Sequence, residues 1–104
     1  MIAVIFQVVP KPGRTDDYFD AATALAGEVA KIDGFISVER FASVTNPGKF
    51  LSLSLWRDEA SVERWYVHSG HRIAQARGRD DVFADYRITV AAVLRDYDMA
   101  AGRP

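Results

Sequence analysis

Apolar side chains along the chain recur with two different periods, and the shorter period predicts four strands. Continuous or alternating apolar residues, rich in β-branched and aromatic types, indicate strands over residues 2–9, 35–43, 50–56 and 86–97. A turn sequence, Thr45-Asn46-Pro47-Gly48, separates the second segment from the third. These two segments are therefore expected to form a hairpin.

The longer period predicts two helices, one after the first strand and one after the third. The first begins at the N-cap candidate Thr15, ends at Gly34 and includes Gly27, which marks a possible point of close packing. Asp58 is the expected N-cap of the second helix, which runs to about residue 67 and is followed by a helical stretch over 71–77. One apolar stripe defines the first helix, formed by Tyr18, Ala22, Leu25, Val29 and Ile32.

The resulting order, β-α-β-β-α-β, predicts an α+β protein of the ferredoxin-like type, with an antiparallel sheet and both helices on one of its faces. Residues 1–98 are expected to form one domain, and the small and polar residues 99–104 a flexible C-terminal tail.

Alternation within the strands predicts which side chains lie under the helices. Each strand has one wholly aliphatic face, expected to be the covered one, while its opposite face is mixed but too apolar to lie in water. Two such sheets packed face to face would make a homodimer. The aliphatic sets are Ile2, Val4, Phe6 and Val8, then Leu51, Leu53 and Leu55, then Ile88, Val90, Ala92 and Leu94.

Composition excludes several classes of function. The chain has 104 residues and a net charge of −1, which gives no strong field for binding nucleic acid or an anionic membrane. It has no cysteine, and hence no disulfide, thiolate zinc site or cysteine nucleophile. The apolar start at residues 1–6 is too short for a membrane span and lacks the basic region of a signal peptide. A soluble cytoplasmic protein is expected.

Candidate chemistry is concentrated between Trp56 and His71, where both tryptophans and both histidines fall within sixteen residues. His68 and His71 have the spacing of metal ligands on a helix, but Gly70 lies between them. Without a further histidine or any cysteine, a site would need Asp58, Glu59 or Glu63, so no metal is expected.

Two interpretations of this segment stay open. Val62, Trp65 and Tyr66 share one helical face, which favours packing. His71 follows Ser69-Gly70 at the start of a helix, where the dipole favours a neutral imidazole able to act as a general base, or simply a solvated cap residue.

Several short motifs in this order resemble those of the antibiotic biosynthesis monooxygenase (ABM) domain family. They are Gly34-Phe35 opening a strand, then Ser54-Leu55-Trp56, Asp58-Glu59-Ala60, Trp65 and His71, and the resemblance extends over about residues 2–97. It implies a dimeric α+β barrel. Some members oxygenate aromatic polyketide intermediates without a prosthetic group, some degrade heme, and many have no established reaction.

The heme-degrading branch pairs a first-strand Asn with a Trp and a His in the second helical region. Here Phe6 and Gln7 occupy the place of that Asn, and Trp65 matches the Trp. The spacing of the heme-ligating His falls on Gln75 rather than on His71. Heme degradation is therefore disfavoured.

The resemblance implies a cofactor-independent monooxygenase that oxidises a small aromatic substrate, such as a quinol or anthrone, with O2. His71 would be the base, with His68 in reserve, and Trp65 and Tyr66 would line the pocket. Tyr18 and Phe19 on the first helix are possible wall residues. The alternative is a small-molecule-binding or stress-related protein with the same cavity and no turnover.

Overall fold

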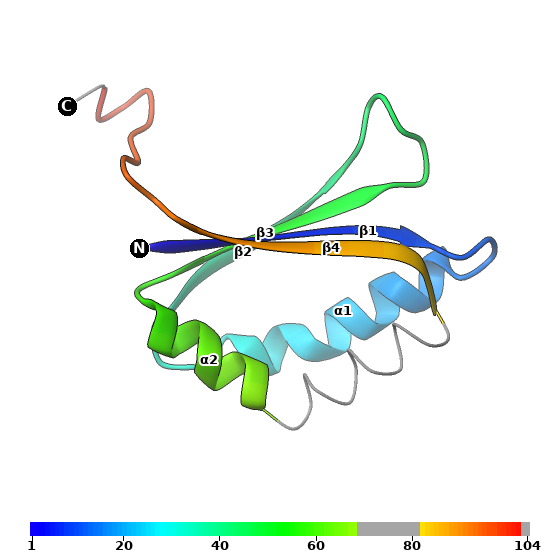
Figure 1. The fold of residues 1–104 in the computed structure, drawn as a ribbon, viewed down its shortest axis with the longest axis horizontal. Coiled ribbons are helices and arrows are strands. Elements are labelled where there is room, and N and C mark those ends of the chain that lie inside the picture. The colour runs from blue at the N-terminus through cyan, green and yellow to red at the C-terminus, as the bar shows by residue number, and fades with distance from the viewer. Residues whose placement is uncertain (69–81, 103–104) are drawn as a thin grey trace.

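A computed structural model describes residues 1–68 and 82–102 of the chain. Its elements are β1 (Ile2–Pro10), α1 (Thr15–Val29), β2 (Phe35–Ala42), β3 (Phe50–Trp56), α2 (Glu59–Val67) and β4 (Phe83–Ala92). The strands form one antiparallel sheet in the order β2-β3-β1-β4, and both helices lie on the same side of it (Figure 1). The ferredoxin-like α+β fold is confirmed. Within the described ranges no helix has the length and apolar character needed to cross a membrane.

The ends of two elements differ from the prediction. β4 spans residues 83–92 instead of 86–97, because it pairs with β1 from Pro10 opposite Phe83 to Ile2 opposite Ala92. Beyond this pairing, among the described residues, only the bond from the N–H of Val93 to the carbonyl of Met1 follows, where the chain of β1 begins. α1 ends at Val29, five residues before Gly34, and its N-cap position is Arg14, without a side-chain capping bond, instead of Thr15. The predicted helix over 71–77 lies outside the described residues.

Strand register corrects the predicted face of β3. Cross-strand partners share one face of a sheet, and Val4 lies opposite Ser54 while Ile2 lies opposite Trp56. Ile2 and Trp56 pack against Val29 of α1, so the helix-facing side of β3 carries Trp56 and its serines. The prediction that the β3 leucines lie under the helices is therefore wrong, and Leu94, also expected there, is exposed beyond the end of β4. We call the side away from the helices the open face; it carries Ala3, Ile5, Leu51, Leu53, Leu55 and Ala91.

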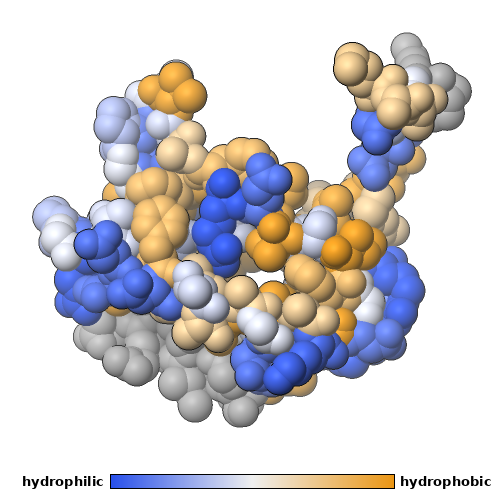
Figure 2. Space-filling model, turned by 180° about the vertical axis from the view of Figure 1, so that it is seen from behind, coloured by the Kyte–Doolittle hydropathy of each residue, from blue (hydrophilic) through white to orange (hydrophobic). Residues whose placement is uncertain are grey.

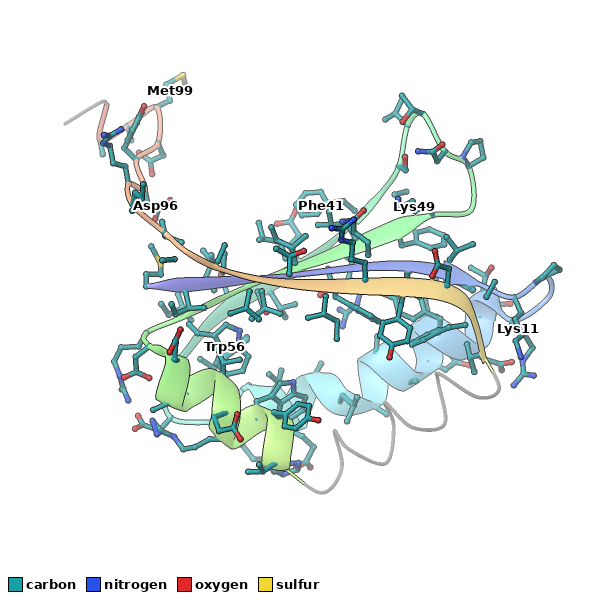
Figure 3. All side chains as sticks on the ribbon, viewed as in Figure 1. Lys11, Phe41, Lys49, Trp56, Asp96 and Met99 are labelled. Carbon is teal, nitrogen blue, oxygen red and sulfur yellow. The ribbon has the colours of Figure 1, made fainter. Side chains whose placement is uncertain are left out.

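The core lies at the end of the sheet where β1 begins. Trp56 is only 1% exposed, contacts Phe35 edge-on at 5.3 Å between ring centroids, and donates its indole N–H to Ser54 Oγ at 2.9 Å. Figure 3 shows Trp56 between the sheet and the helices, with Phe41 and Lys49 on the other side. A buried tryptophan removes roughly 150–250 Å² from water, which makes Trp56 a main anchor of the helices.

A hydrogen-bonded junction joins the start of β2 to the start of α2. As predicted, Asp58 caps α2: its carboxylate accepts bonds from the backbone N–H of Ser61 at 2.8 Å and from the hydroxyl of Ser61 at 2.5 Å. These bonds, and a further one from Arg57, lower the pKa of Asp58 to about 2. The backbone N–H of Arg57 donates to Gly34 at 2.8 Å, and its guanidinium forms two bonds to Asp33 at 3.0 and 3.1 Å.

Gly34 sits at this junction with a φ of +97°, and a Cβ atom there would come within 1.7 Å of Ser61 Oγ. We expect Gly34→Ala to lower the free energy of unfolding by about 2 kcal/mol or more, because Ser61 is fully buried and has no room to move. Urea denaturation followed by circular dichroism measures this change.

Gly27→Ala is the matched control. A Cβ there would meet no described atom within 4 Å, so Gly27 does not mark the close packing that its position suggested. Since Gly27 is in a helix, Ala should leave the stability unchanged or raise it by up to about 1 kcal/mol. Equal unfolding midpoints for the two variants would contradict the role of Gly34.

Candidate functional site

A cavity of about 860 Å³ lies between the sheet and the two helices. Cavities that bind small molecules commonly have about 300–1,000 Å³, so this one is large enough for a substrate of several rings. Its sheet side is mainly apolar, with Val4 and Phe6 from β1, Val38 from β2, and Ile88 and Val90 from β4. The predicted covered faces of β1 and β4 are thus confirmed for these residues.

Aromatic rings line one end of the cavity, where β1 finishes and β4 begins. Phe83 contacts Phe6 at 5.7 Å and Tyr18 at 6.0 Å between ring centroids, and Tyr18 also stacks on Phe50 at 6.1 Å. At the other end, Trp65 of α2 packs against the core around Trp56. A flat, apolar ligand would therefore meet aromatic surfaces at both ends.

A few polar groups interrupt this apolar lining. Arg40 of β2 and Ser52 of β3 are cross-strand partners on the helix-facing side, and both line the cavity. Tyr18 of α1 is 5% exposed, and its hydroxyl makes no hydrogen bond of ordinary geometry to any described residue. Burial raises the pKa of Tyr18 above its ordinary value, although the adjacent Arg40 opposes the shift. Tyr18 is therefore a neutral phenol at physiological pH.

The structure brings together three of the six residues predicted for the site. Tyr18, Trp65 and Tyr66 all line the cavity. Phe19 is absent from its described lining and packs edge-on against Phe50 at 5.0 Å. The other two predicted residues are the histidines.

His68 also lies away from the described lining. It stacks on Trp65 with ring centroids 5.4 Å apart, and its Nε2 is 3.4 Å from a carboxylate oxygen of Glu28. Its buried Nδ1 has no hydrogen-bond partner among the described residues. His71, the predicted base, lies outside those residues, and its role stays a prediction.

The sequence analysis did not identify Arg40, Ser52 or Ser54 as cavity residues. Ser54 accepts the indole N–H of Trp56 at 2.9 Å, so it supports the wall of the cavity. The alternation of Ser52 and Ser54 with Trp56 indicated that these residues share one face of β3, but not that this face is the covered one. No local sequence pattern indicated that Arg40 lines the cavity.

Whether the cavity resembles that of the heme-degrading branch depends on which side chains β1 contributes to it. Phe6 lines the cavity, whereas Gln7, one residue further along the strand, points to the opposite face. β1 therefore places no amide in the cavity where the heme-degrading branch has its Asn. In residues 1–68 and 82–102, no group of three or more His, Cys, Asp or Glu side chains could hold a metal ion.

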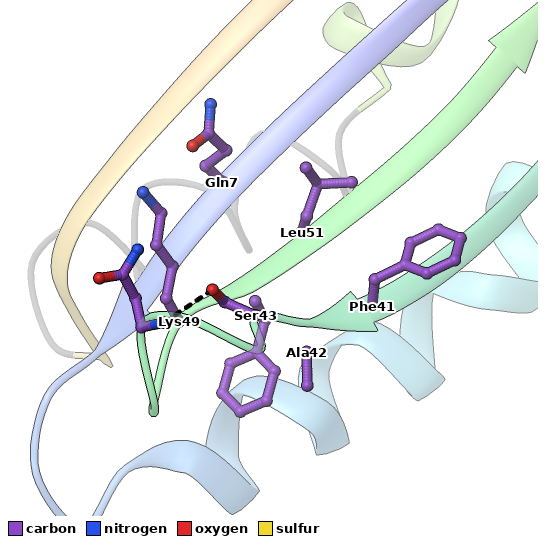
Figure 4. A pocket seen from close by; sticks show the side chains of 8 residues that line it. Gln7, Phe41, Ala42, Ser43, Lys49 and Leu51 are labelled. Atoms are coloured by element: carbon purple, nitrogen blue, oxygen red, sulfur yellow. Dashed lines mark hydrogen bonds between the residues drawn. The ribbon is translucent and has the colours of Figure 1, made fainter.

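A smaller pocket of about 300 Å³ lies beside the β2–β3 hairpin (Figure 4). Gln7, Leu51 and Lys49 border it, and the turn behind it is held by a bond from the backbone N–H of Asn46 to Ser43 Oγ at 3.0 Å. Gln7 and Leu51 face away from the helices, and no described residue lines both pockets, so this pocket is separate from the main cavity.

Comparison with known proteins identifies the family. A family model described as antibiotic biosynthesis monooxygenase matches residues 1–77, and the chain therefore belongs to this family.

One relative carries the name of this family, and a solved structure shares the fold. The chain is 47% identical to a protein of Pyricularia oryzae named jasmonate monooxygenase ABM over 93 residues, which are 89% of this chain but only 43% of that protein. It is 29% identical to the Bacillus subtilis protein YqjZ, covering 79% of it. The structure of Rv0793 from Mycobacterium tuberculosis shares the fold with a TM-score of 0.83 at 18% identity, covering 93% of this chain and 98% of that one.

The buried Tyr18 hydroxyl leads to a prediction about stability. A buried polar group without a hydrogen-bond partner costs about 1–3 kcal/mol of desolvation, so Tyr18→Phe should keep the ring contacts and remove this cost. We expect the free energy of unfolding to stay equal or to rise by about 1 kcal/mol. Urea denaturation of the two proteins at one pH tests this, and a loss of more than 1 kcal/mol would show that the hydroxyl has a structural partner.

Proposed function

We propose that this protein is a cofactor-independent monooxygenase that oxidises a small, ring-containing substrate with O2 in the cavity between sheet and helices. The main support is the cavity itself, because it combines a volume of about 860 Å³ with aromatic walls and a mainly apolar lining. Membership of the monooxygenase family, and a relative named for the oxygenation of jasmonate, support the same reaction class.

The chemistry requires a substrate that can give up a proton and then an electron. A methylene activated by neighbouring rings and a carbonyl, as in an anthrone, loses a proton to a base and then an electron to O2. The substrate radical combines with superoxide, and the protonated peroxide loses water. The net change is CH2 + O2 → C=O + H2O, so one oxygen atom enters the product and the other leaves as water. An apolar cavity keeps bulk water away from these intermediates.

The proposed roles follow from the site and the sequence. His71 is the base, and His68, next to Glu28, is the reserve base. Trp65 and Tyr66 form the wall on α2, where Trp65 would lie against the ring of the substrate. Tyr18 is a polar contact from α1, and Phe19 keeps Tyr18 and Phe50 in place through ring contacts.

Oxygen uptake tests the reaction. Metal-stripped protein should consume O2 with at least one member of a panel containing an anthrone, a quinol and jasmonate, and chelator should not reduce the rate. His71→Ala should lower the rate by about 10²–10⁴-fold, the usual contribution of a general base. Lys31→Gln, an exposed change outside the cavity lining, is the control.

The outcomes of this experiment separate the alternatives. Equal rates for His71→Ala and the parent would remove His71 from the mechanism. No uptake, together with tight binding of one panel member, would point to a non-catalytic binding protein.

The proposal includes a homodimer formed through the open face. This face carries apolar side chains on three strands: Leu55, Ala3 and Ala91 lie in one cross-strand row, and Leu53 and Ile5 lie in the next row, which ends at Thr89. Figure 2 shows the β2–β3 hairpin and the C-terminal segment rising on either side of a hollow on this side of the sheet. A second copy would remove the leucines from water and complete a barrel of two sheets.

A new charge on the β4 edge of this face tests the dimer. Ala91→Glu should raise the dissociation constant of the dimer by about 100-fold or more, because a carboxylate would be buried without a partner. Thr23→Glu, with the same new charge on an exposed position of α1, should leave it unchanged. Sedimentation equilibrium measures both, and a monomeric parent protein would refute the barrel.

A further inference from the structure

We infer that the substrate carries a carboxylate, and that Arg40 together with the hydroxyl of Tyr18 binds this group at one corner of the cavity. The inference rests on the proposed function in one respect only, namely that the cavity is the substrate site. It adds the chemical class of the substrate, an apolar ring compound with an acid group.

The first observation is the unused hydroxyl of Tyr18. The side chain lines the cavity and is 5% exposed, yet its oxygen has no hydrogen-bond partner of ordinary geometry among the described residues. Buried polar atoms are nearly always bonded in folded proteins, so an exception needs an explanation. A bond made only when a ligand is present explains it.

The second observation is the position of Arg40. It lies on the edge strand β2, beside the Tyr18 hydroxyl, and its cross-strand partner on the same face is Ser52. Three other arginines, Arg14, Arg57 and Arg64, form ion pairs with carboxylates. Arg40 has no such pair with any residue in the described ranges. Because Arg40 is exposed to solvent at the rim of the cavity, it can remain charged without an ion-pair partner until a ligand arrives.

The chemistry of these two groups selects the ligand. A guanidinium offers only donors, and a neutral phenol beside it still has its own O–H to donate. The phenol O–H needs an acceptor, and so do the guanidinium N–H groups that do not approach the Tyr18 oxygen. Two acceptors of the lining are engaged elsewhere, since the carboxylate of Asp17 pairs with Arg14 and Ser54 Oγ accepts from Trp56. Asp20 also lines the cavity but is exposed on α1 and forms no ion pair with Arg40. An ionised carboxylate is acceptor-only and matches the fork of an arginine in a bidentate pair.

The rest of the cavity limits what else the ligand can contain. Phe6, Val38, Ile88 and Val90 offer apolar surface next to this polar corner. A ligand with several charged groups would leave the others desolvated, which is costly. One acid group on an apolar ring body satisfies both regions.

Binding of a matched pair of probes tests the inference without any need for turnover. Titration calorimetry with 1-naphthylacetate and its neutral amide, 1-naphthylacetamide, should show the acid binding the parent protein about tenfold more tightly or better, since a bond to a charged group is involved. Arg40→Gln should abolish this preference, because it should weaken binding of the acid far more than binding of the amide. Tyr18→Phe should weaken binding of the acid several-fold with little effect on the amide.

Lys31→Gln is the control for net charge, because it removes one positive charge from a side chain that is 76% exposed and outside the described cavity lining. It should keep the full preference for the acid. The amide serves as an internal check that each variant is folded with an intact cavity.

A parent protein without preference for the acid would overturn the inference, and so would a preference that survives Arg40→Gln. These results are distinct from failure of the proposed reaction. If oxygen uptake is absent while the preference depends on Arg40, the acid site stands and the oxygenase proposal falls.

Discussion

The pairing of β1 with β3 in one register, with Ile2 opposite Trp56, is the constraint on which the other features depend. Side chains alternate across a strand, so a slip of one residue would exchange every side chain of β3 between the two faces. In the observed register the indole of Trp56 lies under the helices, the serines reach the cavity, and the leucines occupy the open face. Core, cavity and proposed interface are thus decided by the same set of backbone hydrogen bonds.

The hydrogen-bonded junction and the buried hydroxyl of Tyr18 lie at opposite ends of the sheet. At the end where β1 begins, polar groups are satisfied by one another: Ser61 is bonded to Asp58, and Arg57 to Asp33. At the other end, the buried O–H of Tyr18 has no acceptor among the described residues, although Arg40 lies beside it. An unsatisfied group has a cost, and such costs are typical of sites prepared for a ligand. This contrast distinguishes the cavity corner from the hydrogen-bonded junction, although both contain charged side chains.

A shared backbone fold does not imply shared chemistry at the cavity. The backbone agrees with that of a mycobacterial protein at 18% identity, so very different side chains can build the same sheet and helices. Function then depends on the few groups that face the cavity. Here β1 presents Phe6 to the cavity rather than an amide, and β2 presents Arg40. We therefore expect Phe6 and Arg40 to help determine which substrate this protein binds.

Local patterns were enough to predict the order of the elements, the stripe on α1 and the cap at Asp58, because each depends on residues close together in the chain. Trp65, Tyr66 and Tyr18, which the family resemblance suggested as pocket residues, line the cavity, and their roles stay predictions. The face of β3 could not be predicted, since leucines alternate with Phe50 and Trp56 and both faces are apolar. The proposed role of Arg40 could not be predicted either, because it depends on the neighbouring Tyr18, which lies on a different element. Only the tertiary structure decided these points, since register and contacts between elements are properties of the packed chain.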